Sequence, residues 1–274
     1  MKLAFSTNAF KQVSLEDSLR EIAACGYGGV EIMADVPHAY PPHVNRRRRE
    51  SLRQLLRELR LKVTNLNAFT LFAQGDTWHP SWIEPDAAAR RRRIEHTADA
   101  VRLARDLGAP GISLEPGGPL PEGMTRREAT ALFRAGLEEV LPLAEECGVD
   151  LLVEPEPDLL IERPDQFEKL LDGFTHPRLA LNFDVGHFYC VGVDPAEAAR
   201  QLAAHIRHVH LEDIAPSREH RHLVPGRGAI DFDAVFAALR DAGYDGWVTV
   251  ELYPYEAQAR QVAAEAFAYL ARWF

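Results

Sequence analysis

The sequence has few cysteines, no long apolar run and no excess of positive charge. Cys25, Cys147 and Cys190 stand far apart, a spacing that offers neither a disulfide framework nor a zinc finger and that suits a reducing cytoplasm. No apolar stretch approaches the ~20 residues that span a bilayer. The opening "MKLAFSTNAF" lacks the apolar core of a signal peptide and is typical of a first strand. We therefore expect a cytoplasmic protein without a membrane partner.

The charge balance is acidic. Aspartate and glutamate number 41 against 31 lysines and arginines, a formal net charge of −10. A surface of this sign repels nucleic acid, so nucleic acid is not an expected partner. Two runs of four arginines, at 46–49 and 90–93, fall near the starts of expected helices. We interpret both as solvated helix faces rather than as phosphate-binding patches.

A repeated pattern of a glycine followed by a short, mostly apolar run indicates the fold. It occurs in "CGYGGVEIM" at 25–33, "LGAPGISLE" at 107–115, "CGVDLLVE" at 147–154 and "AGYDGWVTVE" at 242–251. The glycine would cap a helix in the left-handed conformation. A parallel strand covered by helices would follow it. The chain therefore consists of strand–helix units.

Eight such units can be counted. The expected strands lie at 3–7, 29–33, 62–67, 111–115, 150–154, 178–184, 207–211 and 247–252. Helices are expected between them, for example over 44–60, over 125–146 behind a Thr125–Glu128 capping box, and from Pro195 onward. Eight βα units predict an α/β fold, a single-domain (β/α)8 TIM barrel over residues 1–274. The alternative is an open doubly wound sheet, whose dinucleotide-binding form is disfavoured because no GxGxxG follows the first strand.

The fifth to eighth expected strands each carry, at or near their ends, a side chain of a type that binds metals. These residues are Glu154, Asp184, His210 and Glu251. The carboxyl ends of barrel strands meet at one mouth and neighbouring strands are about 4.8 Å apart, so the four side chains should converge. Taken alone, each of these residues is as often an ordinary strand-end residue as a metal ligand. Together, three converging carboxylates would repel one another without a cation. Oxygen-rich ligands with one histidine suit one divalent ion, Mn²⁺, Mg²⁺ or Co²⁺.

Five segments of the chain are similar to those of a known family. They are "VEPEP" at 153–157, "NFDVGH" at 182–187, "HVHLED" at 208–213, "VPGRGAIDF" at 224–232 and "GYDGWVTVEL" at 243–252. On these segments the chain resembles the sugar phosphate isomerase/epimerase family of xylose isomerase-like TIM barrels. The resemblance implies that Glu154, Asp184, His210 and Glu251 bind one divalent metal.

The resemblance implies a metal-dependent isomerase or epimerase acting on a small sugar, cyclitol or other keto-polyol. A metal-stabilised enediolate would form while Glu154 and Glu251, as catalytic residues, move a proton on the two faces of the substrate. Loss of a β-hydroxyl from the same enediolate would instead make the protein a dehydratase or another lyase. Leu160 stands where ketose 3-epimerases carry a glutamate, which puts a ketohexose substrate in doubt.

Two alternatives belong to other functional classes: an endonuclease IV-like metal-dependent phosphodiesterase, and a barrel that binds without turnover. The endonuclease branch carries histidine where this chain has Asn67 and Glu115, and aspartate where it has His220. Those differences disfavour a three-metal site. His187, His220 and His222 still leave room for a second metal.

Further residues are expected to contact the substrate. The resemblance places His187, on the loop after the sixth strand, against a substrate oxygen. It places His222 at a position that holds a substrate-binding arginine or a metal-binding histidine. Glu31, Asn67 and Glu115 end strands, and Glu156 follows Glu154 by two residues, so all four should line the same pocket.

The loop after the third strand is long and aromatic. It reads "AFTLFAQGDTWHPSWIEPD" over residues 68–86 and includes Phe69, Phe72, Trp78 and Trp82. Such a loop could form a lid that stacks on a sugar and excludes water, with Trp78 against the substrate. It could equally be a flap packed on a neighbouring subunit, which leaves a homodimer or homotetramer open.

Overall fold

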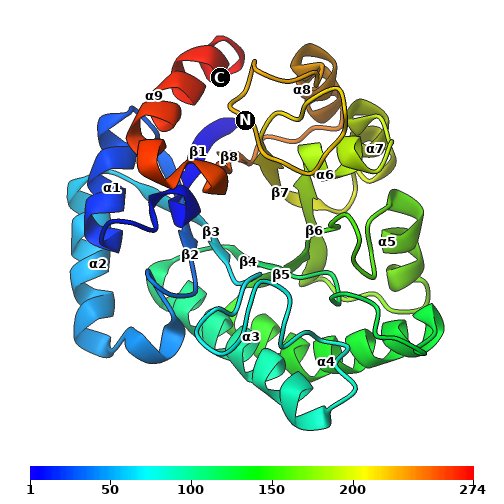
Figure 1. Ribbon diagram of the computed structural model, residues 1–274. Coiled ribbons are helices and arrows are strands. Elements are labelled where there is room, and N and C mark those ends of the chain that lie inside the picture. Colours follow the sequence, from blue (N-terminus) through cyan, green and yellow to red (C-terminus); the bar gives the residue numbers. More distant parts are fainter.

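A closed barrel of eight parallel strands forms the centre of the computed structural model, which describes residues 1–274 (Figure 1). Neighbouring strands pair in the order β1 to β8, and β8 pairs with β1. The strands are β1 Lys2–Ser6, β2 Gly29–Met33, β3 Lys62–Asn67, β4 Gly111–Leu114, β5 Asp150–Val153, β6 Leu179–Asp184, β7 Ile206–Leu211 and β8 Trp247–Val250. All eight predicted strands are present, with bounds that differ by one or two residues at most. The TIM barrel is confirmed and the open sheet is wrong.

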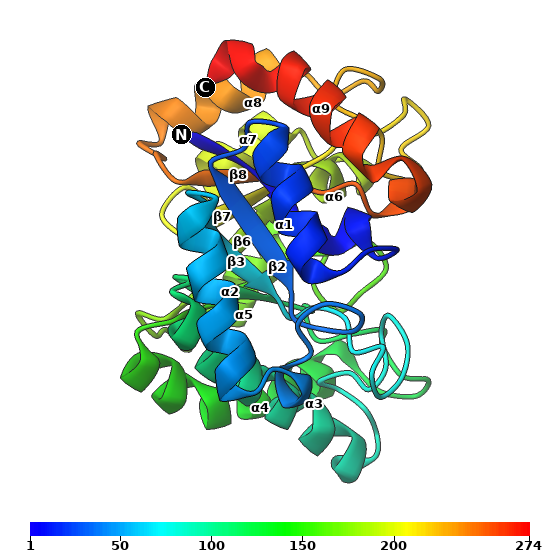
Figure 2. The same cartoon turned by 90° about the vertical axis from the view of Figure 1, so that its left-hand side faces the viewer.

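Helices surround the barrel, as the two cartoon views show (Figures 1 and 2). The α-helices are α1 Leu15–Ala24, α2 Arg46–Glu58, α3 Ala87–Leu107, α4 Arg126–Cys147, α5 Pro164–Leu171, α6 Val185–Cys190, α7 Pro195–Gln201, α8 Phe232–Asp241 and α9 Ala259–Leu270. Short 3-10 helices are η1 Thr7–Phe10, η2 Pro41–His43, η3 Tyr253–Gln258 and η4 Ala271–Trp273. The predicted Thr125–Glu128 capping box and the helix that begins at Pro195 are both confirmed.

The core has an apolar outer layer and a polar centre. One continuous cluster of 72 buried apolar residues accounts for the single domain. Inside the barrel, polar side chains at alternate strand positions contact one another across strands. The amide of Asn65 bonds Glu31 at 2.8 Å and His208 bonds Thr249 at 2.9 Å. Because successive strand residues face opposite sides, the strands bury apolar residues outward and direct polar ones into the barrel.

The second arginine run departs from its prediction at one position. The side chain of Arg93 is completely buried, although it was interpreted as part of a solvated face. Its guanidinium donates to the carbonyl oxygens of Pro80 at 2.8 Å and Phe69 at 2.7 Å, and its Nη2 lies 3.6 Å from Glu115. The loop over 68–86 has no strand to pair with, so its carbonyls need another donor. Arg93 supplies donors to two points of that loop, residues 69 and 80.

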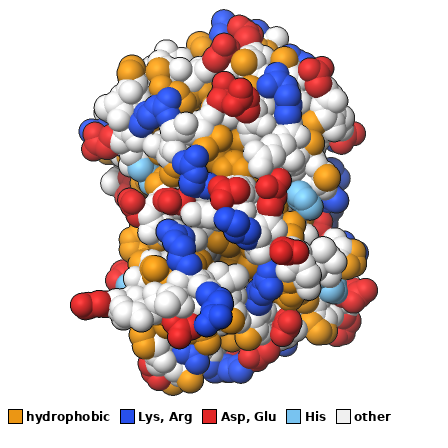
Figure 3. Space-filling model, turned by 90° about the vertical axis from the view of Figure 1, so that its right-hand side faces the viewer, with side chains coloured by type: hydrophobic (Ala, Val, Ile, Leu, Met, Phe, Trp, Pro, Cys, Tyr) orange, Lys and Arg blue, Asp and Glu red, His pale blue; other side chains and the backbone are white.

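The surface carries both signs of charge. Figure 3 shows acidic and basic side chains interspersed over one face of the molecule. Many of the arginines form ion pairs there and elsewhere, such as Arg46 with Glu50 at 2.9 Å and Arg91 with Glu139 at 2.7 Å. None of the helices combines the length and the apolar content that crossing a membrane requires.

We expect Arg93→Met to lower the free energy of unfolding by about 3 kcal/mol, since it leaves buried Glu115 without its cation and two loop carbonyls without donors. Arg92→Met, at an exposed position of the same helix, should change it by no more than about 0.5 kcal/mol. Urea unfolding followed by circular dichroism measures both. Equal stability of the two variants would contradict the role given to Arg93.

Candidate metal centre and its cavity

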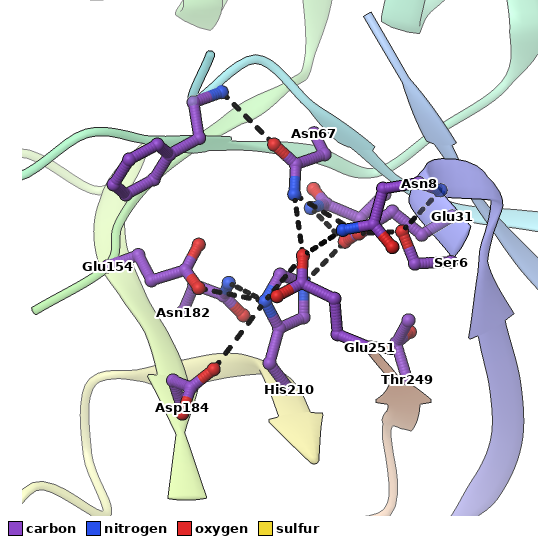
Figure 4. A network of polar contacts seen from close by, with 12 residues as sticks. Ser6, Asn8, Glu31, Asn67, Glu154, Asn182, Asp184, His210, Thr249 and Glu251 are labelled. Atoms are coloured by element: carbon purple, nitrogen blue, oxygen red, sulfur yellow. Dashed lines mark hydrogen bonds and ion pairs between the residues drawn. The ribbon is translucent and has the colours of Figure 1, made fainter. Parts of the chain in front are cut away.

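The four predicted metal ligands meet at the C-terminal mouth of the barrel. The ligand atoms of Glu154, Asp184, His210 and Glu251 all lie within 4.8 Å of one another, and Figure 4 shows the side chains turned toward a common point. Asp184 ends β6 and His210 lies in β7, while Glu154 and Glu251 directly follow β5 and β8. None of the four is more than 6% exposed.

His210 turns its two ring nitrogens in opposite directions. Nδ1 faces the cluster, 2.8 Å from Oε1 of Glu154, 4.0 Å from Oδ2 of Asp184 and 3.9 Å from Oε1 of Glu251. Nε2 points deeper into the barrel and lies 2.6 Å from Oε2 of Glu31. Of the two nitrogens, Nδ1 is therefore the one placed to bind an ion held by the three carboxylates.

Two carboxylate oxygens of the cluster lack a hydrogen-bond partner. Asp184 caps α6, because its Oδ1 accepts from the backbone N–H of His187 at 2.8 Å, and its Oδ2 has no donor. Oε2 of Glu154 is also buried and without a donor. Unpartnered buried carboxylate oxygens are costly, and a cation between them would remove that cost. Three carboxylates and one imidazole therefore fit a hard or borderline divalent cation.

The cluster has unusual proton affinities. Burial raises the pKa of Glu154 and raises that of Glu251 well above its ordinary value, although His210 opposes both shifts. Burial alone would lower the pKa of His210, but the carboxylates of Glu154, Glu31 and Glu251 hold it well above the usual range. The crowded negative charge therefore favours bound protons. A divalent cation would compete with those protons for the same atoms.

Two asparagines hold one oxygen of Glu251. The amide nitrogen of Asn8 donates to Oε1 of Glu251 at 2.7 Å, and that of Asn67 donates to the same oxygen at 3.1 Å. Asn67 also lines the cavity, as predicted, but its amide is engaged by Glu251 rather than turned wholly toward a substrate. Sequence reasoning missed Asn8. The available signal was a polar residue directly beyond the first strand.

A cavity of about 430 Å³ opens above the cluster. One wall is polar and contains Glu154, Glu156, His187, His220 and Glu251. Glu156 and His187 face each other there, with Oε2 and Nε2 3.1 Å apart. Glu156 and His187 therefore lie where the sequence placed them, beside the candidate metal ligands. His187 belongs to the first turn of α6 rather than to a loop, because Asp184 caps that helix.

The opposite wall is largely apolar. Met33, Phe69, Phe72 and Trp78 line it, and the rings of Phe69 and Trp78 meet edge to face with centroids 5.9 Å apart. Buried Asp35 fixes this part of the loop, since its Oδ2 accepts from the N–H of Phe72 at 2.5 Å. Trp78 therefore borders the cavity, in the place predicted for it.

Trp82, the fourth aromatic residue of the candidate lid, does not belong to this wall. Its side chain is 1% exposed and packs against Phe133 of α4, with ring centroids 5.5 Å apart. A Cβ on Gly136 would lie 2.8 Å from the Trp82 ring, so a larger residue there would crowd the indole. Trp82 therefore anchors the far end of the loop in the core, while the near end borders the cavity.

Glu115 and His222 are buried and do not line the cavity, contrary to expectation. Glu115 lies beside Arg93, and burial raises its pKa to about 8 even though Arg93 opposes that shift. His222 donates from Nδ1 to the backbone carbonyl of Glu251 at 2.9 Å, and the ring of Tyr253 lies 4.5 Å from its own. Glu115 packs against Arg93 and His222 against Tyr253, so the position of a residue near the barrel mouth does not by itself decide its exposure.

Three histidines gather beside the polar wall. Ligand atoms of His187, His220 and His222 lie within 4.8 Å of one another. His187 donates from Nδ1 to the carbonyl of Pro155 at 2.9 Å, which leaves its Nε2 toward Glu156. Burial lowers the pKa of each of the three to about 3, so all three rings are neutral near pH 7.

Glu212 is a further buried carboxyl that sequence reasoning missed. It is completely buried and neither oxygen has a hydrogen-bond partner. Burial, followed by the nearby Asp184, raises its pKa well above the ordinary value. It packs against Gly186, the second residue of α6. It therefore supports the turn that places Asp184.

The glycines of "VPGRG" shape a turn, as expected. Oδ2 of Asp213 accepts from the backbone N–H of Gly226 at 2.9 Å and of Gly228 at 2.8 Å. Because a side chain of the same chain already occupies these amides, they do not form a phosphate cradle.

Comparison with known proteins places the chain in a family. The family model for the xylose isomerase-like TIM barrel matches residues 19–273. The chain belongs to this family. A relative named inosose dehydratase from Clostridium beijerinckii is 27% identical over 259 residues, which cover 88% of this chain and 83% of that protein.

Solved structures agree on the fold. A D-tagatose 3-epimerase-like protein superimposes with a TM-score of 0.81 at 22% identity and covers 99% of both chains. The IOLI protein, whose structure has a bound zinc atom, superimposes with a TM-score of 0.82 at 21% identity, covering 100% of this chain and 99% of its own. At these identities the likeness shows the barrel and no more.

We expect Gly186→Ala to destabilise this xylose isomerase-like barrel by about 2 kcal/mol, because the added methyl group overlaps buried Glu212. Gly28→Ala is the matched control, since its methyl group would meet only Trp247, at 3.9 Å. Thermal unfolding of the two variants measures the difference. A Gly186 variant as stable as the Gly28 variant would show that Glu212 is free to move aside.

Proposed function

We propose that the protein is a metal-dependent dehydratase acting on an inosose, a ketone derived from a cyclitol, or on a closely related keto-sugar. The cluster of Glu154, Asp184, His210 and Glu251 at the floor of a sugar-sized cavity carries the proposal. The similarity to proteins named inosose dehydratase over 88% of the chain supports the choice of reaction.

The four residues of the cluster would hold one divalent cation. When bound, such an ion supplies a Lewis acid that polarises a substrate carbonyl and makes the neighbouring C–H bond more acidic. The donor set of three carboxylates and one imidazole favours Mn²⁺, Mg²⁺ or Co²⁺ and is compatible with Zn²⁺.

Glu154 and Glu251 are the candidate bases. Asn8 and Asn67 hold Oε1 of Glu251, which leaves Oε2 as the oxygen free to take a proton. In Glu154, Oε1 contacts His210 and Oε2 has no donor. Each glutamate therefore has one oxygen available for the proton next to the carbonyl. Positioned bases of this kind typically contribute about 10²–10⁴-fold to a rate.

Elimination also needs a proton for the departing hydroxyl. As the C–H bond breaks, its electron pair forms a C=C bond, the adjacent C–O bond breaks, and the hydroxyl leaves as water once it gains a proton. Oε2 of Glu156 lies 3.1 Å from Nε2 of His187 in the polar wall, close enough for a proton to pass between them. They are placed to pass it to a hydroxyl bound beside Glu154.

The apolar wall suits a ring substrate. A cyclitol presents C–H bonds on one face and hydroxyls around its edge, so Phe69 and Trp78 could cover the former while the polar wall binds the latter. Lys11 is the only cationic side chain at the cavity, and Glu256 pairs with it at 2.8 Å. A neutral substrate therefore fits better than a phosphorylated one.

Isomerisation or epimerisation is the second candidate. It is favoured by one observation, that Glu154 and Glu251 each keep a free oxygen. If one removes the proton and the other returns it, the centre is inverted without loss of water. The two reactions share the first step and differ only in the fate of the β-hydroxyl.

We expect Glu251→Gln to keep the fold and to lower the exchange of the substrate's α-proton by about 10³-fold or more, since the amide cannot take a proton. The exchange is followed by NMR in D₂O with an inosose, and water loss by the absorbance of the conjugated ketone. Glu122→Gln, on an exposed loop, is the control. Undiminished exchange in Glu251→Gln would remove this residue from the mechanism.

We expect chelation to abolish turnover and one equivalent of Mn²⁺, Mg²⁺ or Co²⁺ per chain to restore it, because the cluster offers ligands for a single ion. Elemental analysis of the purified protein and metal titration of the chelated protein give the stoichiometry. Three ions per chain would instead favour a phosphodiesterase, and full activity without any ion would contradict the proposed function.

A further inference from the structure

His210 is the one member of the cluster with a carboxylate on both sides of its ring. Nδ1 faces Glu154 at 2.8 Å, and Nε2 faces Glu31 at 2.6 Å. Glu31 comes from β2, on another side of the barrel, and is completely buried beneath the cluster, so, contrary to expectation, it does not line the cavity. Figure 4 shows Glu31 to one side of His210, with Ser6 and Asn8 close by. Glu31 is not one of the four candidate metal ligands, and the proposed reaction gives it no role.

The neighbours of Glu31 are hydrogen-bond donors. The hydroxyl of Ser6 donates to its Oε1 at 2.9 Å, and the amide nitrogen of Asn65 donates to its Oε2 at 2.8 Å. The amide of Asn67 adds a longer contact of 3.4 Å. A carboxylate that accepts from each of these groups has no proton to give. His210 must therefore be the donor in the contact between Nε2 and Glu31.

This donation decides which ring nitrogen carries the proton when His210 is neutral. A neutral imidazole carries a single N–H, so a proton held on Nε2 leaves the lone pair on Nδ1. Without an ion, Nδ1 contacts Oε1 of Glu154 at 2.8 Å and the amide nitrogen of Asn182 at 3.1 Å, so its lone pair becomes available when a cation displaces the proton on that side. Nδ1 is also the nitrogen that faces Glu154, Asp184 and Glu251.

We propose that Glu31 is a positioning residue for the metal centre: it holds the proton of His210 on Nε2 and so presents the Nδ1 lone pair to the cation. The inference rests on the proposed function of the cluster as a metal site. A carboxylate that accepts from the far nitrogen of a histidine ligand orients the ring and increases its basicity, and removing it typically weakens metal binding 10- to 100-fold.

A second possible metal site shares Glu31 and His210 with this arrangement. Ligand atoms of Glu31, His208 and His210 also lie within 4.8 Å of one another, so an ion could bind there directly. The oxygens of Glu31 already accept from Ser6 and Asn65, and Nε2 of His208 lies 2.9 Å from the hydroxyl of Thr249. The upper cluster, in contrast, has two oxygens without donors. The cation therefore belongs to the upper cluster, and Glu31 acts through His210.

Titration with Co²⁺, read from its absorption bands and by calorimetry, measures the affinity. We expect Glu31→Gln to weaken Co²⁺ binding by at least about 10-fold, because the amide is a weaker acceptor for Nε2. His208→Gln should weaken it less. Ser113→Ala, which removes a buried hydroxyl of the barrel that contacts no partner, should leave the affinity unchanged. Equal losses in the Glu31 and His208 variants would identify Glu31 as a direct ligand and overturn the positioning role.

¹⁵N NMR of the Zn²⁺-loaded wild-type protein with labelled histidines measures the state of each ring nitrogen of His210. This experiment does not depend on the folding of a variant. We expect the His210 signals to show a proton on Nε2 and a metal-shifted Nδ1. The opposite pattern, or unchanged affinity in Glu31→Gln while the wild type binds Co²⁺ tightly, would overturn the inference alone. A wild type that binds no divalent ion would overturn the proposed function, and the inference with it.

Discussion

Buried negative charge at the C-terminal mouth of the barrel is the constraint on which the rest of the structure depends. Closure of the barrel brings the ends of β5 to β8 together and places three carboxylates and an imidazole within 4.8 Å of one another. In a buried site, like charges at such distances repel strongly and pay a desolvation cost as well. Protons can relieve part of this, as the raised pKa values of Glu154 and Glu251 indicate. A divalent cation would relieve it more fully.

The surrounding polar network distributes hydrogen-bond donors unequally among these carboxylates. Asn8 and Asn67 occupy one oxygen of Glu251, and the backbone N–H of His187 occupies one oxygen of Asp184. Other oxygens of the cluster remain without donors. Such an arrangement fixes the direction of each side chain while it leaves atoms free for an ion and for a substrate proton. The polar wall of the cavity therefore carries carboxylate oxygens that are positioned for proton transfer. The aromatic wall opposite is held in place by the hydrogen bond between Asp35 and the backbone of Phe72.

Much of the fold could be predicted from the sequence because it depends on local signals. The glycine that precedes four of the strands, capping residues such as Thr125 and the apolar runs themselves located all eight strands within two residues. The ligand cluster followed from the same register, since strand ends of a barrel share one mouth. Some polar residues of the barrel interior were not predicted, although the sequence carries a signal for them. Polar residues alternate within two strands, at Asn65 and Asn67 and at His208 and His210. Such spacing in a buried strand marks side chains that face into the barrel.

The sequence by itself determined the barrel and the four side chains at its mouth, because strand periodicity and strand ends are local properties. Only the tertiary structure decided which polar residues support them. Asn8 and Glu251 are 243 positions apart in the chain yet bonded, and Glu31 reaches His210 across 179 positions. Arg93, read from its charged neighbours as solvent-exposed, is buried because a distant loop needs its donors. Burial and partners of this kind arise from contacts across the closed barrel, which no local pattern records.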